Sequence, residues 1–291
     1  MTRVRQIGGS RWDESPIAAP AESWAGFLEG GDVLFLPRLR FDIGTHETSL
    51  FTPSILGSSK NASFDPRTGR LGGTTASGTE AETLRALIAR FSEAAATLTQ
   101  VMFPEYRGQL MRGRASFRPA EIAGRASSWR KDDTRLHVDS FPATPSGGRR
   151  ILRVFSNVNP DGRARSWRVG DDFAAVAHRF APQLRLPLAG LGYLLALARI
   201  TKSPRSAYDA LMLQLHDCMK GDEDFQSASP QTAVDFPAGS TWLAFTDEVS
   251  HAAMAGQYQL EQTFLLPVAA MQDPDRSPLR TLERIKGRRL A

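Results

Sequence analysis

The segment Thr134-Arg135-Leu136-His137-Val138-Asp139 is the most informative part of this 291-residue chain. Its alternation of apolar and polar residues predicts a β-strand, in which side chains two positions apart point the same way. Leu136 and Val138 would then face a hydrophobic core, and His137 and Asp139 would share the opposite face. From that face an imidazole and a carboxylate can bind one metal ion together.

A third candidate ligand, His251, lies far along the chain, after a strand-like run at 240–245 and a short connection at 246–250. Two imidazoles and one carboxylate form the set that holds Fe(II) on one side and leaves the opposite positions open for a cosubstrate and O₂. A His-x-Asp pair alone is weak evidence, because the chain has five His and 31 acidic residues. The β-like surroundings and the later His251 favour a metal site formed by His137, Asp139 and His251.

Composition limits the class of protein. With 291 residues, of which 41% are hydrophobic, the chain can form one large domain or two small ones. A single cysteine excludes a disulfide framework and a multi-cysteine zinc site, and suits a reducing compartment. Residues 1–10 lack the apolar stretch of a secretory signal, so we expect a soluble, cytoplasmic protein. The most apolar segment, 186–198, is too short to cross a bilayer, and we interpret it as a buried helix rather than a membrane-adhering one.

The net charge of +5 is unevenly distributed. Residues 107–168 contain 14 Lys or Arg and 5 Asp or Glu, a net charge of +9, so the rest of the chain carries −4. This basic region would attract anions to a cleft, such as small anionic substrates, anionic sugars or phosphorylated lipids. Nucleic acid is a weaker candidate, because no nucleic-acid motif is present and few aromatic residues separate the basic ones. A solvated basic surface is the alternative.

The remaining pattern predicts a mainly β fold with helical additions. We expect an N-terminal arm at 1–21 and a single oxygenase domain at 22–291, with a helical insert at about 172–230. Apolar periodicity and turn residues predict strands at 32–36, 150–158, 240–245 and 258–266, helices at 79–100, 172–180 and 208–219, and a long polar loop at 53–73. Strands that carry metal ligands and flank a helical insert favour a double-stranded β-helix, or jelly roll, as the oxygenase core.

Several longer motifs resemble the Kdo hydroxylases, and the likeness extends from about residue 33 to residue 267. The motifs are LHVDSFP at 136–142, LRVFSNVNPDG at 152–162, FTDEVSHAAMAGQY at 245–258 with EQTF at 261–264, SSKN at 58–61 and LQLHDCMK at 213–220. Kdo hydroxylases are Fe(II)/2-oxoglutarate dioxygenases of Gram-negative bacteria. They hydroxylate 3-deoxy-D-manno-oct-2-ulosonic acid (Kdo) at C3 in the lipid A–inner core of lipopolysaccharide, which gives the sugar Ko.

The resemblance implies that His137, Asp139 and His251 hold the iron. It also implies that 2-oxoglutarate and O₂ are the cosubstrates, with ascorbate stimulating turnover. The implied substrate is Kdo-bearing lipid A, reached by peripheral contact with the cytoplasmic face of the inner membrane rather than by a membrane span. No nucleic-acid partner is implied, and the oligomeric state stays open.

The residue that binds the far carboxylate of 2-oxoglutarate is harder to identify. Related oxygenases often place an Arg shortly after the second His, but glutamines occupy that region here. Other branches use a basic residue on a strand after the His-x-acid motif, which favours Arg153. Arg153 lies in an apolar run, where an unpaired charge is costly, and its planar guanidinium suits a two-point grip on a carboxylate. Arg149 and Arg150 are alternatives, and Arg153 would be structural if it pairs with a carboxylate such as Glu261.

Other residues have weaker links to the site. The candidates for substrate contacts are Lys60, Asn61, Arg130 and His216. His216 lies in a helical segment, which favours a structural side chain over a substrate contact. Asp247 or Ser250 is expected to orient His251.

Two other classes of function would use the same residues differently. A zinc hydrolase or lyase would bind zinc through the same two His and one Asp, but it needs a general base, and none occurs at a telling spacing. In a non-enzymatic basic protein that binds lipid or nucleic acid, the His-x-Asp pair would be incidental. Metal content after anaerobic purification, together with 2-oxoglutarate turnover, separates the three classes.

Overall fold

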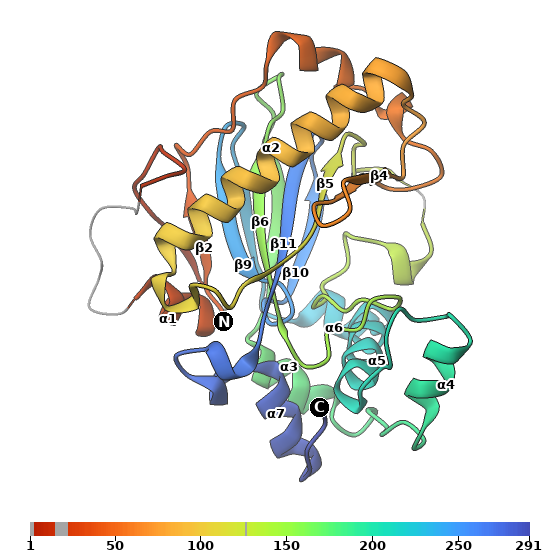
Figure 1. The fold of residues 1–291 in the computed structure, drawn as a ribbon. Coiled ribbons are helices and arrows are strands. Elements are labelled where there is room, and N and C mark those ends of the chain that lie inside the picture. Colours follow the sequence, from red (N-terminus) through yellow and green to blue (C-terminus); the bar gives the residue numbers. More distant parts are fainter. Residues whose placement is uncertain (1–2, 15–22, 126) are drawn as a thin grey trace.

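The protein is built around two β-sheets (Figure 1). The computed structural model describes residues 3–14, 23–125 and 127–291. Within these residues the larger sheet has the strand order β1-β2-β9-β6-β11-β5-β3-β4, and the smaller sheet has the order β10-β7-β8. In those orders, the strands are Val4–Gln6, Val33–Leu36, Thr241–Phe245, Arg150–Asn157, Gln259–Leu266, Met111–Arg118, Ala62–Asp65 and Arg70–Gly72, and then His251–Ala255, Arg165–Val169 and Thr232–Phe236.

The central strand of the larger sheet is one of the last in the sequence. β11 is hydrogen-bonded to β6 on one side and to β5 on the other, both antiparallel. Strand β1 differs from the rest of the sheet because it runs parallel to β2. The sheet therefore joins segments from both ends of the chain.

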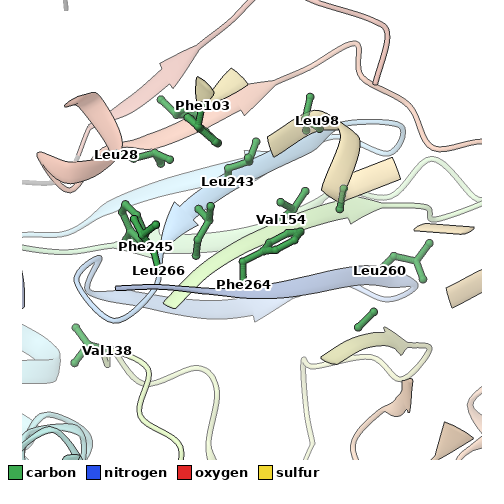
Figure 2. Close-up of a cluster of buried hydrophobic side chains, with 14 of the residues drawn as sticks. Leu28, Leu98, Phe103, Val138, Val154, Leu243, Phe245, Leu260, Phe264 and Leu266 are labelled. Carbon is green, nitrogen blue, oxygen red and sulfur yellow. The ribbon is translucent and has the colours of Figure 1, made fainter. Parts of the chain in front are cut away.

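A long helix, α2 (Gly78–Met102), covers the outer face of the larger sheet (Figure 1). Its apolar residues recur at helical spacing between Leu84 and Leu98 and are buried. Side chains alternate along a strand, so Val154 of β6 and Leu243 of β9 point toward this helix, and Leu98 lies on the same side of the sheet (Figure 2). This packing forms the main hydrophobic core.

The shorter helices gather at one end of the molecule (Figure 1). They are α1 (Trp24–Glu29), α3 (Phe173–Phe180), α4 (Leu191–Leu197), α5 (Ala207–Gly221), α6 (Glu223–Ala228) and α7 (Pro278–Lys286). Four of them, α3 to α6, lie between β7 and β8 in the chain, in the interval where a helical insert was expected.

The inner face of the larger sheet packs against the smaller sheet through aromatic residues. The rings of Phe236 and Trp242 stack with centroids 4.1 Å apart, and the ring of Phe155 lies 5.3 Å from that of Trp242. Trp167 of β7 closes the cluster against Phe155. Farther along the same face, Arg153 and its neighbours Asp139 and Glu261 form a polar region. This two-sheet arrangement agrees with the predicted jelly roll.

Part of the expected N-terminal arm is ordered into the sheet. Residues 15–22 of that arm, like residues 1–2, lie outside the described residues. Val4–Gln6 form the edge strand β1, and Arg5 forms an ion pair with Asp32 beside it. The prediction that residues 1–21 form an arm outside the oxygenase domain is therefore wrong for this strand, which is too short and too polar to be recognised by apolar alternation.

The long polar loop expected at 53–73 also contains regular structure. Strands β3 and β4 pair within it as an antiparallel hairpin. Ala62 and Phe64 alternate into the core, whereas the neighbouring positions are only partly buried. Two apolar residues among glycines and serines are too weak a signal to predict such a short strand.

The segment 134–139 is extended but is not a strand of either sheet. Its backbone makes a single antiparallel bridge, between His137 and His251. The predicted alternation of side chains still holds, because Leu136 and Val138 are fully buried. The strand assignment was wrong, although the shared orientation of the two candidate ligands was right.

The apolar segment 186–198 is not a buried helix. It contains the short helix α4, none of whose residues is buried. In Figure 1, α4 lies at the edge of the molecule, beside α5 and away from the sheets. The core is already closed by α2 and by the helices next to the smaller sheet, so this segment has no interior surface to cover.

Candidate active site

His137, Asp139 and His251 converge in the polar region between the two sheets. The ligand atoms of the three side chains all lie within 4.8 Å of one another. Nε2 of His137 is 3.9 Å from Oδ1 of Asp139, and the two imidazole centroids are 4.7 Å apart. Two nitrogen donors and one carboxylate at this spacing can hold one divalent metal ion.

The backbone fixes these ligands relative to one another. The N–H of His137 donates to the carbonyl of His251 at 3.0 Å, and the N–H of His251 donates to the carbonyl of His137 at 2.9 Å. The N–H of Asp139 donates to the carbonyl of Thr246 at 2.7 Å. Two segments that are distant in sequence are thus joined at the point where they supply the ligands.

Each imidazole is oriented by a backbone carbonyl two residues earlier in the chain. Nδ1 of His137 lies 2.8 Å from the carbonyl oxygen of Arg135, and Nδ1 of His251 lies 2.8 Å from that of Val249. A carbonyl only accepts, so each Nδ1 donates its proton and each Nε2 keeps a lone pair for a metal. The backbone therefore selects the tautomer that a metal site needs.

Burial and neighbouring charges set the protonation of the three ligands. Burial lowers the pKa of His137 well below its ordinary value, and His251 and Lys220 lower it further. Burial also lowers the pKa of His251. For Asp139, burial alone would raise the pKa, but the positive charge of Arg153 and the two imidazoles lower it below its ordinary value. At neutral pH the set is therefore in the form that binds metal.

Three buried arginines, Arg153, Arg118 and Arg165, line the polar region beside the candidate metal site. Arg153 lies with Nε 3.2 Å from Oδ2 of Asp139 and with one terminal nitrogen 3.6 Å from Oε2 of Glu261. Arg118 grips Glu261 with two hydrogen bonds of 2.9 and 3.0 Å. Burial, reinforced by the charge of Arg118, lowers the pKa of Arg165 to about 9. The guanidinium of Arg153 beside the metal ligand Asp139 favours the binding of an anion next to the metal.

Two atoms at the centre of this arrangement lack hydrogen-bond partners. Nε of Arg153 and Oδ2 of Asp139 are both buried and unsatisfied within the described residues, because their mutual geometry does not make a hydrogen bond. Buried polar atoms are rarely left without partners. A metal ion at Asp139 and an anionic cosubstrate at Arg153 would satisfy both, so the residues fit Fe(II) together with 2-oxoglutarate.

Comparison with known proteins identifies the family. The family model described as 3-deoxy-D-manno-oct-2-ulosonic acid (Kdo) hydroxylase matches residues 11–289. The chain belongs to the Kdo hydroxylase family. No curated protein matched the chain.

Solved structures agree with this assignment. The Kdo hydroxylase KdoO, in complex with alphaketoglutarate and Fe(III), is 45% identical to this Kdo hydroxylase, with a TM-score of 0.93 over 99% of this chain and 97% of that chain. KdoO in complex with cobalt(II) is 46% identical, with a TM-score of 0.94 and the same coverage. KdoO is a non-haem Fe(II), alphaketoglutarate-dependent dioxygenase.

These matches confirm the family, the oxygenase core and the enzyme class predicted from the sequence. The two other classes of function, a zinc hydrolase or lyase and a non-enzymatic basic binding protein, are therefore wrong. In the part of this Kdo hydroxylase that the structure describes, no helix is both long and apolar enough to cross a membrane.

Of the three arginines considered for the cosubstrate, only Arg153 lies at the site. Arg150 points to the other face of β6, where it is fully buried and paired with Asp247, at 2.8 Å, and with Glu248. Arg149 donates to a backbone carbonyl in its own loop. The structure contradicts both alternatives. Arg153 does approach Glu261, as the structural alternative required, but Arg118 makes the closer pair with that carboxylate.

The expected orienting role of Asp247 or Ser250 is also wrong. Asp247 is occupied by Arg150 and by the N–H of Ile151. The hydroxyl of Ser250 has no hydrogen-bond partner among the described residues. A main-chain carbonyl performs the orientation instead, and no sequence pattern reveals such a contact.

His216 is nearer to the candidate metal site than its helical context indicated. Its ring meets that of His137 edge to face, with centroids 5.4 Å apart, and its Nδ1 lies 3.1 Å from Asp217. Burial and the charge of Lys220 lower its pKa. The side chain is thus in place to border a bound substrate.

Of the other weak candidates, Lys60 and Asn61 are partly buried and Arg130 is exposed. Lys60 forms an ion pair of 3.0 Å with Asp133, which Arg125 also contacts at 2.9 Å. Its neighbour Asn61 is partly buried and directly precedes β3. Arg130 is 61% exposed and pairs with Asp217, so it belongs to the surface near α5.

Sequence reasoning missed several residues that shape the site. The ring of Trp167 stacks on that of His251, with centroids 5.0 Å apart. The side chain of Gln226 in α6 accepts from the N–H of Leu136 at 2.8 Å and donates to its carbonyl at 3.0 Å. Neither role has a sequence signal. Arg118 has none either, because it ends a strand with three arginines, MRGRASFR, in which a charge does not stand out.

Proposed function

We propose that this protein hydroxylates Kdo at C3 in Kdo-lipid A to give Ko, using Fe(II), 2-oxoglutarate and O₂. The observation that carries the proposal is the convergence of His137, Asp139 and His251 beside the unsatisfied guanidinium of Arg153. The complexes of KdoO with alphaketoglutarate and with succinate support the same cosubstrate chemistry. The matching family model supports Kdo as the sugar.

Different residues of the chain would bind the iron and the cosubstrate. His137, Asp139 and His251 would hold the iron, and Arg153 would bind the carboxylate of 2-oxoglutarate that lies far from the metal. When bound, the iron supplies the redox chemistry that couples decarboxylation of 2-oxoglutarate to insertion of one oxygen atom into a C–H bond. Arg118 neutralises Glu261 and so keeps Arg153 available for the cosubstrate.

The protein would also position the sugar and limit the access of water to the reacting groups. Trp167 covers one face of His251, and the aromatic cluster behind it fills the space between the sheets. An apolar wall of this kind limits water around the reacting groups and strengthens their electrostatic interactions. His216, Lys60, Asn61 and Arg130 are proposed to border the sugar, because Kdo carries a carboxylate and lipid A carries phosphates.

We also propose the setting in which the enzyme works. Residues 22–291 would act as a single oxygenase domain, preceded by the segment 1–21. The protein would be cytoplasmic and would make peripheral contact with the cytoplasmic face of the inner membrane, where its lipid substrate is located.

The test uses Kdo₂-lipid A as substrate. The purified protein is incubated with Fe(II), ascorbate, 2-oxoglutarate and this lipid, and mass spectrometry is expected to show the gain of one oxygen atom on a Kdo unit. The His251→Ala protein is the matched control and should give no gain. If the active protein oxidises a peptide, a nucleobase or an uncharged small molecule but leaves Kdo unchanged, the substrate assignment fails.

A further inference from the structure

The apolar surface of the protein is concentrated in one segment. Of the nine large apolar side chains that are exposed in the described part of the chain, seven lie between Leu186 and Ile200. Leu197 is 82% exposed, Leu188 81% and Tyr193 74%. We call residues 186–200 the α4 segment. Soluble monomers rarely expose a continuous apolar patch without a partner that covers it.

The α4 segment is held in a fixed place although its middle is exposed. At its start, the N–H of Arg185 donates to the side chain of Gln214 in α5, and the Gln214 amide donates back to the Arg185 carbonyl. Just after its end, the N–H of Lys202 donates to the carbonyl of Ala143 at 3.0 Å, and Arg205 donates to that of Pro142. Anchored at both ends, the segment lies at the edge of the molecule (Figure 1), and its exposed apolar side chains form a ridge there.

The charged residues of the ridge and its two ends are all positive. Residues 185–205 contain four basic residues and no acidic residue. Arg185, Arg199 and Lys202 are exposed, and within the described residues none of them takes part in an ion pair. The arginines of the basic region 107–168 differ in this respect, since many are paired with carboxylates. Unpaired positive charge next to exposed leucines is the pattern of a surface that adsorbs to anionic lipid.

We propose that the α4 segment docks the enzyme onto a bilayer with anionic headgroups. Leu188, Leu194 and Leu197 would enter the acyl region, and Tyr193 would lie at the headgroup level that aromatic residues prefer. Arg199 and Lys202 would contact the phosphates. A second copy of the chain is a poorer partner, because a two-fold contact would bring the same unpaired positive charges together.

The location of the segment would bring a docked bilayer close to the candidate metal site. This part of the argument rests on the function proposed above. A groove of about 410 Å³ runs between α4 and α5 and is lined by Leu186, Leu191 and Asp217, among others. Asp217 contacts His216, whose ring borders that of His137. The docked bilayer would therefore lie on the His216 side of the candidate metal site, from which a lipid-anchored sugar would approach while its acyl chains stay in the membrane.

The test is flotation with vesicles that contain no substrate. The wild-type protein is mixed with vesicles of phosphatidylethanolamine and phosphatidylglycerol, or of phosphatidylcholine alone. We expect binding to the anionic vesicles, and a ratio of bound to free protein that falls about tenfold or more in the double variant Leu194→Glu/Leu197→Glu. Arg199→Gln/Lys202→Gln should weaken binding to the anionic vesicles specifically. Met111→Glu, which changes an exposed apolar residue outside the segment, is the matched control and should bind like the wild type.

Three outcomes contradict the proposal. It is overturned if the wild type does not float with anionic vesicles, or if the leucine variant floats equally well while circular dichroism shows that it is folded. It is also overturned if light scattering finds a wild-type dimer that the leucine variant converts to a monomer, because the ridge would then be a self-association surface. Vesicle binding without oxygen gain on Kdo would leave the docking surface in place and remove the proposed function instead.

Discussion

Arg153 occupies the most consequential position at the residue scale. It shares a buried region with Asp139 and Glu261, yet its Nε has no hydrogen-bond partner among the described residues. A carboxylate from outside the chain would supply that partner. The side chain is thus prepared for an anion rather than satisfied by the fold.

Replacing Arg153 by Met should weaken the cosubstrate and spare the metal. Loss of a buried charge-assisted contact costs roughly 2–5 kcal/mol, which corresponds to an increase of about thirtyfold or more in the 2-oxoglutarate concentration at half-maximal turnover. Succinate formation over a series of 2-oxoglutarate concentrations gives this value, and iron stoichiometry is measured on the same sample. Arg149→Met is the control, because Arg149 lies outside the site. An unchanged requirement in Arg153→Met would exclude Arg153 as the cosubstrate ligand.

Replacing a proposed iron ligand should have the complementary effect. His137→Ala, Asp139→Ala and His251→Ala are each expected to lose bound iron and succinate formation together, because each removes one donor of a three-donor set. His216→Ala should retain the iron, although its ring is only 5.4 Å from that of His137. Iron content by elemental analysis, with circular dichroism to confirm folding, checks the series. Full iron content in any of the three would remove that residue from the site.

The sequence identified the candidate ligands because their chemistry is carried by residue type. Few residue types bind Fe(II), and His137 and Asp139 have the spacing of neighbours on one face. Trp167 and Gln226 could not be found in this way. A tryptophan that stacks on a ligand and a glutamine that holds a backbone segment look the same in sequence as any buried aromatic or helical amide.

At the scale of elements, β6 separates two environments by simple alternation. Arg153 points to the site, whereas Arg150 points to the opposite face and meets two carboxylates with no exposure to water. One cation cannot keep both carboxylates ionised in such a place. Burial raises the pKa of Glu248 to about 8, with Asp247 raising it further against the lowering effect of Arg150.

This raised pKa predicts how stability depends on pH. The folded protein holds a proton on Glu248 that the unfolded chain releases above about 4.5, so the contribution is fully present below that pH and is lost as the pH rises through about 8. Glu248→Gln keeps the shape without the charge. The free energy of unfolding, measured with urea from pH 5 to about 8.5, should therefore fall less steeply with pH in the variant than in the wild type. The exposed Glu93→Gln is the control, and equal slopes in wild type and Glu248→Gln would contradict the assignment.

Elements with a strong periodic pattern could be predicted from the sequence, and weakly patterned ones could not. The helix α2 and the strands β6 and β11 carry long apolar repeats, and each lies within a few residues of its predicted bounds. Strand β1 is short, polar and dependent on its neighbour β2. The prediction of a buried helix at 186–198 failed for the opposite reason. An apolar run indicates that a segment avoids water, but it does not say whether the protein core or another surface covers it.

At the scale of the whole molecule, the basic region 107–168 attracts distant anions less strongly than its net charge of +9 indicates. Seven of its arginines are paired with carboxylates, many from other parts of the chain: Arg112, Arg118, Arg125, Arg130, Arg135, Arg150 and Arg153. Long-range attraction of an anionic surface would therefore depend on the unpaired side chains, which include those of the α4 segment and exposed residues of the basic region such as Arg107 and Arg114.

Turnover on lipid substrate should consequently fall as ionic strength rises. Salt shortens the screening distance from about 10 Å at 0.1 M to about 3 Å at 1 M, which weakens attraction to an anionic bilayer. Succinate formation with vesicle-embedded Kdo₂-lipid A is measured across this range, with deacylated Kdo oligosaccharide for comparison. The steeper loss should occur with the vesicles, and Arg199→Gln/Lys202→Gln should flatten it, whereas Arg112→Gln should not. Equal salt dependence on both substrates would show that membrane attraction does not limit turnover.

The position of β11 in the larger sheet has a consequence for biosynthesis. Residues 259–266 leave the ribosome after all the other described strands, yet they fill the gap between β5 and β6. Until then a nascent chain carries two strands with open edges, which favour pairing with other chains. The sheet therefore forms only after β11 has been synthesised. A chain released before residue 259 should aggregate rather than form a smaller, folded oxygenase.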